Sequence, residues 1–299
     1  MRFSVFTAST PEWTPRQAAR ALAEQGWDGV EWRITDQREA PEPGFWAGNR
    51  STWPFTGLEE RLDEIERVTR DAGLAFSGLG GYQRCDDHDG VERMLAATAR
   101  LGAERVRVTM LPLGTAASGE GEPSGRSYPD LFDETREHVR WLADRAAAHG
   151  VLALIELHPR TVVSSASAAV RLLEDVDPAH VGVIHDSGNL VSEGGEDTLA
   201  GFQMLGSHLA HVHLKNARWR VVGEEGEGAL AGTKRWAPGP VPLREGQCDL
   251  LDLVRSLRRV GYDGWLTVED FSTDEPLAAR TAGNLAYLRA VLAAADAEG

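Results

Sequence analysis

The 299-residue sequence has only two cysteines, Cys85 and Cys248. They form neither a disulfide framework nor a metal-binding spacing, so we expect each to be a small packed hydrophobe in a reducing cytoplasm. No run of about 18 apolar residues occurs, which argues against a membrane-spanning helix. The first residues, MRFSVFTASTPEWTP, also lack the apolar segment of a signal peptide. The sequence therefore predicts a cytoplasmic protein without a membrane partner.

Basic residues are also scarce. Lysine and arginine total 31 against 46 acidic residues, and the net charge is −15. A strongly acidic surface repels phosphate backbones, so we expect no nucleic-acid partner. The composition is compatible with a small-molecule partner and with a homo-oligomer.

One unit recurs along the chain: an amphipathic helix, then a glycine, then a short apolar strand. The glycines stand where a helix cap requires positive φ; they are Gly26, Gly73, Gly102, Gly150 and Gly261. The expected strands are residues 3–7, 29–34, 74–79, 104–110, 151–157, 181–186, 210–215 and 264–270. The expected helices are residues 14–25, 57–72, 91–101, 131–149, 164–175, 196–206, 249–260 and 276–295. Eight near-equal units predict one α/β domain over residues 1–299, a (β/α)₈ barrel rather than an open doubly wound sheet.

Three of the strand-to-helix connections are much longer than the others: residues 35–57, 111–129 and 216–247. All three fall on the C-terminal face of the barrel, where active sites of such barrels lie. The first contains Phe45, Trp46, Trp53 and Phe55, which suit a lid over a ligand. We expect the glycine-rich stretches 114–127 and 223–228 in the other two to be flexible.

The stretch HLAHVHLKN, residues 208–216, places three of the chain's nine histidines together. Alternate side chains of a strand share a face, so His211 and His213 point the same way. Two buried imidazoles need partners. The pair therefore indicates either a metal site or two core histidines with hydrogen-bond partners.

The neighbouring strands end in carboxylates. Glu156, Asp186 and Glu269 close the fifth, sixth and eighth strands, and the histidine pair lies on the seventh. Consecutive strand ends of a barrel lie side by side, and three converging carboxylates repel one another unless a cation neutralises them. Mostly oxygen ligands suit Mn²⁺ or Mg²⁺, with Co²⁺ or Zn²⁺ as alternatives. The pattern predicts one divalent metal.

Four segments carry a resemblance to a known family: ALIELH, HDSGNLVSEGGED, HLAHVHLKN and GYDGWLTVED. They are similar to the xylose-isomerase-like TIM-barrel family of sugar phosphate isomerases and epimerases. The resemblance implies that Glu156, Asp186, His213 and Glu269 bind one divalent metal and that the two glutamates act as acid and base. It leaves His211 one pleat deeper, as a support for the ligands or as part of the core.

The sequence also departs from that family. Many members have a histidine three residues after the metal-binding aspartate, in contact with substrate, and this chain has Asn189. Many have aspartate after the HLK or HVK motif, and this chain has Asn216. The expected metal ligands are intact, but the substrate contacts need not follow the best-known epimerases.

Such a site chelates a carbonyl and the neighbouring hydroxyl and stabilises the enediolate that forms when the adjacent proton leaves. The first hypothesis is therefore a metal-dependent sugar or sugar phosphate isomerase or epimerase. The second is a lyase or dehydratase of keto-sugars or keto-inositols on the same scaffold. The third is a non-catalytic sugar-binding barrel, which has no need of a caged metal.

Other polar and aromatic residues are expected to contact the sugar; they are His158, Arg33, Asn189, Lys215, Trp46, Trp53 and Arg107. Glu31 shares a face with Arg33 and is expected to pair only with a buried base. Arg107 points either into the barrel or into a salt bridge beneath the helices. His185 should face the helices and be structural.

Overall fold

The computed structural model describes residues 1–114 and 125–297. Its centre is a closed barrel of eight parallel strands in the order β1-β10-β7-β6-β5-β4-β3-β2. The strands are β1 Arg2–Phe6, β2 Gly29–Ile34, β3 Ala75–Gly81, β4 Arg105–Val108, β5 Leu152–Glu156, β6 Val181–Asp186, β7 Leu209–Leu214 and β10 Trp265–Val268. The predicted (β/α)₈ barrel is confirmed.

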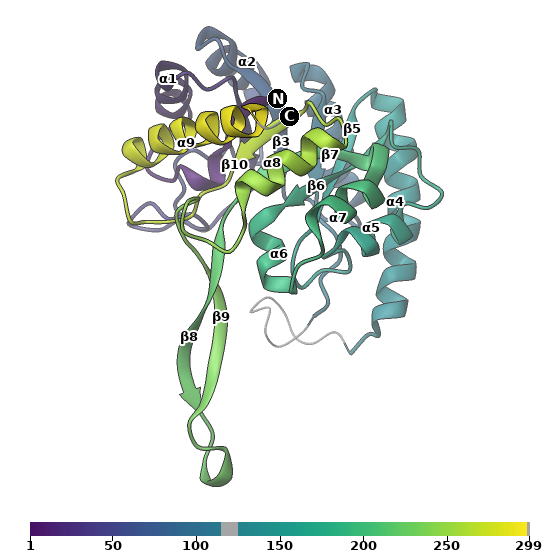
Figure 1. Ribbon diagram of the computed structural model, residues 1–299. Coiled ribbons are helices and arrows are strands. Elements are labelled where there is room, and N and C mark those ends of the chain that lie inside the picture. The colour runs from purple at the N-terminus through teal and green to yellow at the C-terminus, as the bar shows by residue number, and fades with distance from the viewer. Residues whose placement is uncertain (115–124, 298–299) are drawn as a thin grey trace.

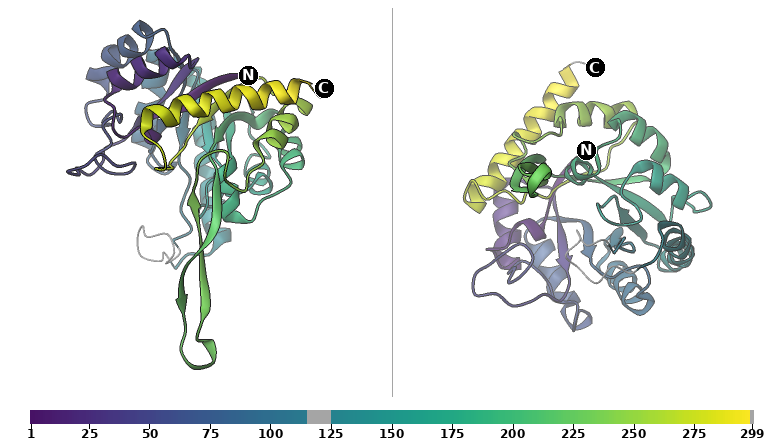
Figure 2. Two further views of the ribbon diagram at one scale, coloured as in Figure 1. Left: turned by 60° about the vertical axis from the view of Figure 1, so that its left-hand side comes forward. Right: turned by 90° about the horizontal axis from the view of Figure 1, so that it is seen from below.

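Helices surround the barrel, as the view along its axis shows (Figure 2, right). They are α1 Pro15–Gln25, α2 Leu62–Asp71, α3 His88–Leu101, α4 Tyr128–His149, α5 Ala166–Leu172, α6 Ser187–Glu193, α7 Thr198–Leu205, α8 Leu250–Arg259 and α9 Leu277–Ala297. Short 3₁₀ helices are η1 Thr7–Ser9, η2 Glu59–Arg61, η4 Gly206–His208 and η5 Gly228–Leu230. The sequence had predicted each of these α-helices except α6, which begins directly after β6.

Local signals set the helix ends. Thr14 and Gln17 form a reciprocal capping box at the start of α1, and Pro15 occupies its first turn. The five glycines that were expected to end helices all have positive φ, between 63° at Gly102 and 88° at Gly26. A side chain is strained in that conformation, so each glycine lets the chain turn back into the next strand.

Phe6, the last residue of β1, is fully buried. Gly80 faces it from β3, and a Cβ at that position would lie 2.1 Å from the Phe6 ring. The ring in turn stacks on the imidazole of His213, with centroids 5.7 Å apart and planes 22° apart. Glycine at position 80 therefore makes room for the aromatic floor of the site.

The connection 216–247, of which the sequence predicted only that stretch 223–228 is flexible, contains two strands. It forms an antiparallel hairpin of β8 Ala217–Glu225 and β9 Thr233–Pro240 that projects far from the barrel (Figure 1). Stretch 223–228 covers the end of β8 and the turn that follows. Most of expected stretch 114–127, residues 115–124, lies outside the described residues.

Among the residues that the structure describes, none of the helices combines the length and apolar character needed to cross a membrane.

Candidate metal centre

Four polar side chains meet at the C-terminal end of the barrel. Glu156 and Asp186 are the last residues of β5 and β6, His213 lies near the end of β7, and Glu269 directly follows β10. The register pairs His213 with Asp186 on one side and with Thr267 on the other. One donor atom from each of the four lies within 4.8 Å of the others, and all four are buried. The structure thus brings together the four residues that the sequence selected.

Two buried atoms of this cluster, Asp186 Oδ2 and His213 Nδ1, have no hydrogen bond of good geometry within the described residues. Asp186 Oδ2 instead forms an ion pair with the Lys215 ammonium at 2.8 Å. Buried polar atoms are normally hydrogen-bonded, so two that converge on one point fit a further ligand. Three carboxylates and one imidazole nitrogen are a donor set for a divalent cation. The residues therefore fit the metal that the sequence predicted.

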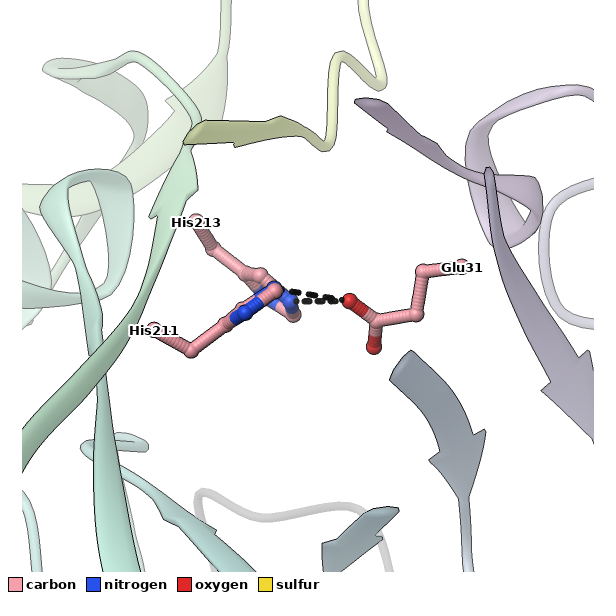
Figure 3. Close-up of side chains that lie close together, drawn as sticks. All are labelled: Glu31, His211 and His213. Carbon is pink, nitrogen blue, oxygen red and sulfur yellow. Dashed lines mark hydrogen bonds and ion pairs between the residues drawn. The ribbon is translucent and has the colours of Figure 1, made fainter. Parts of the chain in front are cut away.

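Glu31 fixes the orientation of His213 (Figure 3). Its Oε2 atom lies 3.1 Å from Nε2 of His213, which leaves Nδ1 facing Glu156 Oε1 at 3.5 Å and Asp186 Oδ2 at 4.0 Å. A carboxylate on the far nitrogen of an imidazole holds the tautomer that exposes the other nitrogen. Nδ1 is thus the atom that His213 offers to a metal. The expectation that Glu31 pairs with a buried base is confirmed.

His211 lies one pleat below and contacts the same carboxylate. Its Nε2 atom is 3.1 Å from Glu31 Oε2 and 2.8 Å from Thr267 Oγ1, and its ring centroid is 5.4 Å from that of His213. Burial lowers the pKa of His211 to about 4, despite the nearby Glu31 carboxylate. His211 is therefore neutral at pH 7 and helps to hold Glu31 in place.

Glu31, His211 and His213 also form a compact group in their own right. The oxygen of Glu31 that faces the two imidazoles is already hydrogen-bonded to both. His211 Nδ1 has no hydrogen-bond partner within the described residues, but this group contains one carboxylate, whereas the group on the other side of His213 contains three.

Lys215 supplies a positive charge inside the cluster. Its Nζ atom lies 2.8 Å from Asp186 Oδ2 and 2.7 Å from Glu269 Oε2. The pleat directs its side chain to the face of His213, as the sequence predicted. Burial lowers the pKa of Lys215, but Asp186 and Glu269 outweigh it and raise that pKa above its ordinary value. The ammonium group is therefore charged throughout the physiological range.

The structure decides which of the two orientations predicted for Arg107 is present. It points into the barrel, where Nη1 donates to Glu156 Oε2 at 2.8 Å and Nε donates to the Gly81 carbonyl at 3.1 Å. Its guanidinium also lies over the rings of Tyr82 and Phe6. Burial raises the pKa of Glu156, but Arg107 and His213 outweigh it and hold that pKa well below its usual range.

Asn189 lies on α6, behind the carboxylates. Its backbone N–H donates to Asp186 Oδ1 at 2.9 Å, so Asp186 caps the helix with one oxygen and directs Oδ2 to the cluster and Lys215. The Asn189 side chain donates to Glu156 Oε1 at 3.2 Å and to the Leu157 carbonyl at 3.1 Å. Its amide therefore positions Glu156 in this structure.

The mouth of the barrel is lined by Arg33, Trp46, Phe271 and His158. Arg33 is buried and donates to the Phe45 carbonyl, which ties the 35–57 connection to β2. Trp46 is 58% exposed and packs on Phe271, with centroids 4.9 Å apart. His158 stands exposed at the rim. These residues lie where a ligand above the metal ligands would meet them.

Trp53 does not belong to the mouth, which corrects the expectation that it covers the pocket. It is 6% exposed and packs edge-on against Trp32, with centroids 6.0 Å apart. Trp32 alternates with the inward-pointing Glu31 and Arg33 and bonds Thr69 of α2, so this pair lies between barrel and helices. An isolated bridge between Trp53 and Ile34 draws that part of the connection into the core.

The sequence reasoning missed Phe6, Tyr82 and Phe271, which form the aromatic surroundings of the site. Phe271 lies two residues after Glu269, and Lys215 Nζ sits 5.6 Å from its ring centroid. That spacing from a proposed ligand was a usable signal. Tyr82 and Phe6 gave none, because their place depends on how the barrel closes.

Neither cysteine takes part in the site. Cys85 is buried, and the Cys248 thiol donates to the Ser187 carbonyl at 2.8 Å. Burial raises the pKa of each thiol to about 12, so neither is a thiolate nucleophile at neutral pH.

The chain matches a known protein family over most of its length. The xylose isomerase-like TIM barrel family matches residues 19–291, nearly the whole chain. The chain belongs to this family. The resemblance inferred from four short motifs is thereby confirmed.

Individual relatives are more distant. An inosose dehydratase of Lacticaseibacillus casei is 32% identical over 146 residues, 47% of each protein. The chain thus spans about half the length of the first curated relatives it matches. The 3-keto-D-glucoside 4-epimerase YcjR from E. coli has a TM-score of 0.70 at 18% identity, over 97% of this chain and 99% of YcjR. A Mycobacterium smegmatis xylose isomerase-like barrel in complex with magnesium has a TM-score of 0.68 at 22% identity, over 98% and 97%.

Proposed function

We propose that this family member is a divalent-metal-dependent enzyme that removes the proton next to the carbonyl of a keto-sugar or keto-inositol. The observation that carries the proposal is the buried cluster of three carboxylates and His213, in which Asp186 Oδ2 and His213 Nδ1 have no hydrogen bond of good geometry within the described residues. A divalent cation bound there would polarise the carbonyl and stabilise the charge left by the departing proton.

Glu156, Asp186, His213 and Glu269 would hold the metal. Three oxygen donors and one nitrogen favour Mn²⁺ or Mg²⁺, with Co²⁺ or Zn²⁺ as alternatives. The magnesium complex of the M. smegmatis relative supports this choice.

The two glutamates differ in their surroundings, and this difference selects the base. Glu156 is tied to Arg107 and Asn189, and a carboxylate with so low a pKa accepts a proton poorly. Glu269 has no guanidinium hydrogen-bond partner within the described residues, and its Oε2 atom lies 2.7 Å from Lys215 Nζ. Glu269 is therefore the proposed base, and Lys215 positions its carboxylate.

One base acting from one side favours elimination of water. Glu269 takes the proton from the carbon next to the carbonyl and gives it to the hydroxyl on the following carbon, which leaves as water. The carboxylate is regenerated, and the substrate loses one water molecule in total. The inosose dehydratase relative supports this outcome.

Isomerisation or epimerisation is the second candidate. Glu156 and Glu269 stand at opposite ends of the arc of four ligand strands, so they would reach a bound sugar from two sides. Epimerisation requires that second side, because the proton returns to the opposite face of the carbon. It also requires Glu156 to exchange a proton despite Arg107.

Incubation of keto-inositols and keto-sugars with the Mn²⁺-loaded protein in D₂O, followed by NMR, tests the proposal. We expect deuterium exchange at the carbon next to the carbonyl together with a dehydrated product. Exchange without water loss would assign the isomerase or epimerase. Glu269→Gln should abolish exchange, while Glu245→Gln, on the outer connection, should leave it intact. A metal-loaded protein that exchanges no proton of any substrate would refute enzymatic enolisation.

A further inference from the structure

The hairpin of β8 and β9, residues 217–240, is called the arm here. It leaves the barrel directly after Lys215 and Asn216, and it projects away from the body (Figure 1; Figure 2, left). Asn216 holds its root, because the side-chain amide donates to the carbonyls of Leu243 and Cys248 beyond the arm. The indole of Trp219 donates to the Val191 carbonyl of α6 at 2.8 Å. The root is therefore fixed to the body.

One face of the arm is apolar. The register pairs Trp219 with Pro238 and Val221 with Trp236, and alternation along each strand places these four side chains on the same face. Val221 is 45% exposed and Trp236 is 56% exposed. Leu230, near the tip, is also exposed. The apolar surface thus continues beyond the part that α6 covers.

The opposite face is basic near the root. Arg218 and Arg220 alternate with Trp219 and Val221, and the Arg220 guanidinium lies over Gly239. Neither arginine has an ion-pair partner within the described part of the chain. In contrast, Lys234 pairs with Glu224, and Arg235 pairs with Glu225, further along the arm. Two unpaired cations therefore stand beside the apolar face.

Such an arm is unfavourable in water by itself. A lone two-stranded hairpin is marginally stable, and both of its strands present unpaired backbone groups at their edges. Large exposed aromatic and aliphatic side chains on a projection are typical of a protein contact. The arm therefore has the properties of a surface that another protein covers.

We propose that the arm clasps a second copy of this chain. The arm holds four of the 31 basic residues and three of the 46 acidic ones, so the rest of the chain is strongly acidic. Arg218 and Arg220 are complementary to such a body, and a twofold axis lets each arm make the same contact with the other copy. The apolar face packs on the partner, and the arginines lie against its carboxylates.

The oligomeric state of the full chain tests the proposal, by sedimentation velocity and light scattering over a range of concentrations. We expect a dimer that Val221→Asp and Trp236→Asp weaken by at least about 30-fold in dissociation constant, as for loss of a buried aromatic anchor. Val170→Asp is the matched control, because Val170 is an exposed valine on α5, outside the arm, with 37% exposure. It should leave the dimer unchanged.

A shortened chain provides the second measurement. Trp219 and Pro238 are register partners, so an Asn-Gly turn in place of residues 220–237 can join them and keeps the Trp219 contact with α6. This variant should be a folded monomer that still binds Mn²⁺, and high salt should weaken the parent dimer. A monomeric parent chain, or a dimer that survives both Trp236→Asp and the shortening, would overturn the proposal. Binding of the arm to vesicles by a monomeric parent would overturn it as well.

Discussion

The ammonium nitrogen of Lys215 lies 2.8 Å from Oδ2 of Asp186, the same oxygen that faces the open side of the metal-ligand cluster. Glu269 Oε2 lies 2.7 Å from the same nitrogen. The chain thus places one of its own cations among the carboxylates that are proposed to bind a metal. This charge keeps the carboxylates together, and it competes with a divalent cation for the same oxygens.

Lys215→Met should destabilise the metal-free protein by about 3–5 kcal/mol, the usual loss when one partner of a buried ion pair is removed. It should also tighten Mn²⁺ binding, so the increase in melting temperature on adding Mn²⁺ becomes larger than in the parent protein. Calorimetry with and without Mn²⁺ measures both effects. The chain has one other lysine, the half-exposed Lys234, and Lys234→Met should change neither. Equal metal shifts in all three proteins would contradict the competition.

The two histidines of the HVH motif should differ in their effect on metal content. His213→Gln removes the nitrogen that faces Glu156 and Asp186, so elemental analysis should find metal lost from a folded protein. His211→Gln should retain one metal per chain with weaker affinity, because Glu31 loses one of its two partners. The reverse pattern would make His211 the ligand.

Metal affinity should rise with pH. Burial raises the pKa of Asp186 to about 7 in the metal-free chain, with Lys215 opposing and Glu269 adding to the effect. His213 is buried, but Glu31 and Glu156 raise its pKa well above the usual value. A metal displaces the proton from each, so the affinity should rise with pH, and more steeply below about pH 7, where Asp186 also gives up a proton, than above it.

Titration calorimetry with Mn²⁺ in buffers of different ionisation enthalpy measures this proton release directly. Above pH 7 Asp186 is already ionised, so the number of protons released should fall from two toward one. A metal affinity that is flat between about pH 5 and 8 would show that neither group gives up a proton to the metal.

The two tryptophans of the 35–57 connection should separate stability from substrate binding. Trp53→Ala should cost about 3–5 kcal/mol of unfolding free energy, because the side chain is packed against Trp32 in the core. Trp46→Ala should leave stability nearly unchanged and raise KM, since Trp46 is exposed on Phe271 at the mouth. Denaturant unfolding and steady-state kinetics on both variants are the measurements. A large stability loss in Trp46→Ala with unaltered KM would remove it from the mouth.

The candidate ligands were predictable because strand and helix patterns are local. Side chains of a strand alternate between its two faces, and this alternation assigns Glu156, Asp186 and His213 to the inward face. The helix-ending glycines indicate where each strand begins. In a closed parallel barrel those positions must lie at the same end. Repetition of a short unit was therefore enough to give the fold and to bring the three carboxylates and the histidine pair to one end of the barrel. The choice of His213 over His211 came from the family resemblance.

The connections were harder to predict than the strands. Nothing in the 35–57 stretch marks Trp53 as core and Trp46 as exposed, since both are tryptophans in an irregular segment. The arm was missed because its strands pair only with each other. They do not belong to the repeating helix–glycine–strand unit from which the barrel was predicted. The alternation of Trp219 and Val221 with Arg218 and Arg220 was present, but inside a connection it did not stand out.

By itself, the sequence determined which side chains point into the barrel and at which end they lie, because backbone periodicity and glycine caps act over a few residues. Only the tertiary structure decided what those side chains touch. Glu31 meets His213, and Arg107 meets Glu156, across the interior of the barrel, at distances set by the closure and tilt of all eight strands. The first contact leaves Nδ1 of His213 facing the carboxylates, and the second lowers the ability of Glu156 to accept a proton.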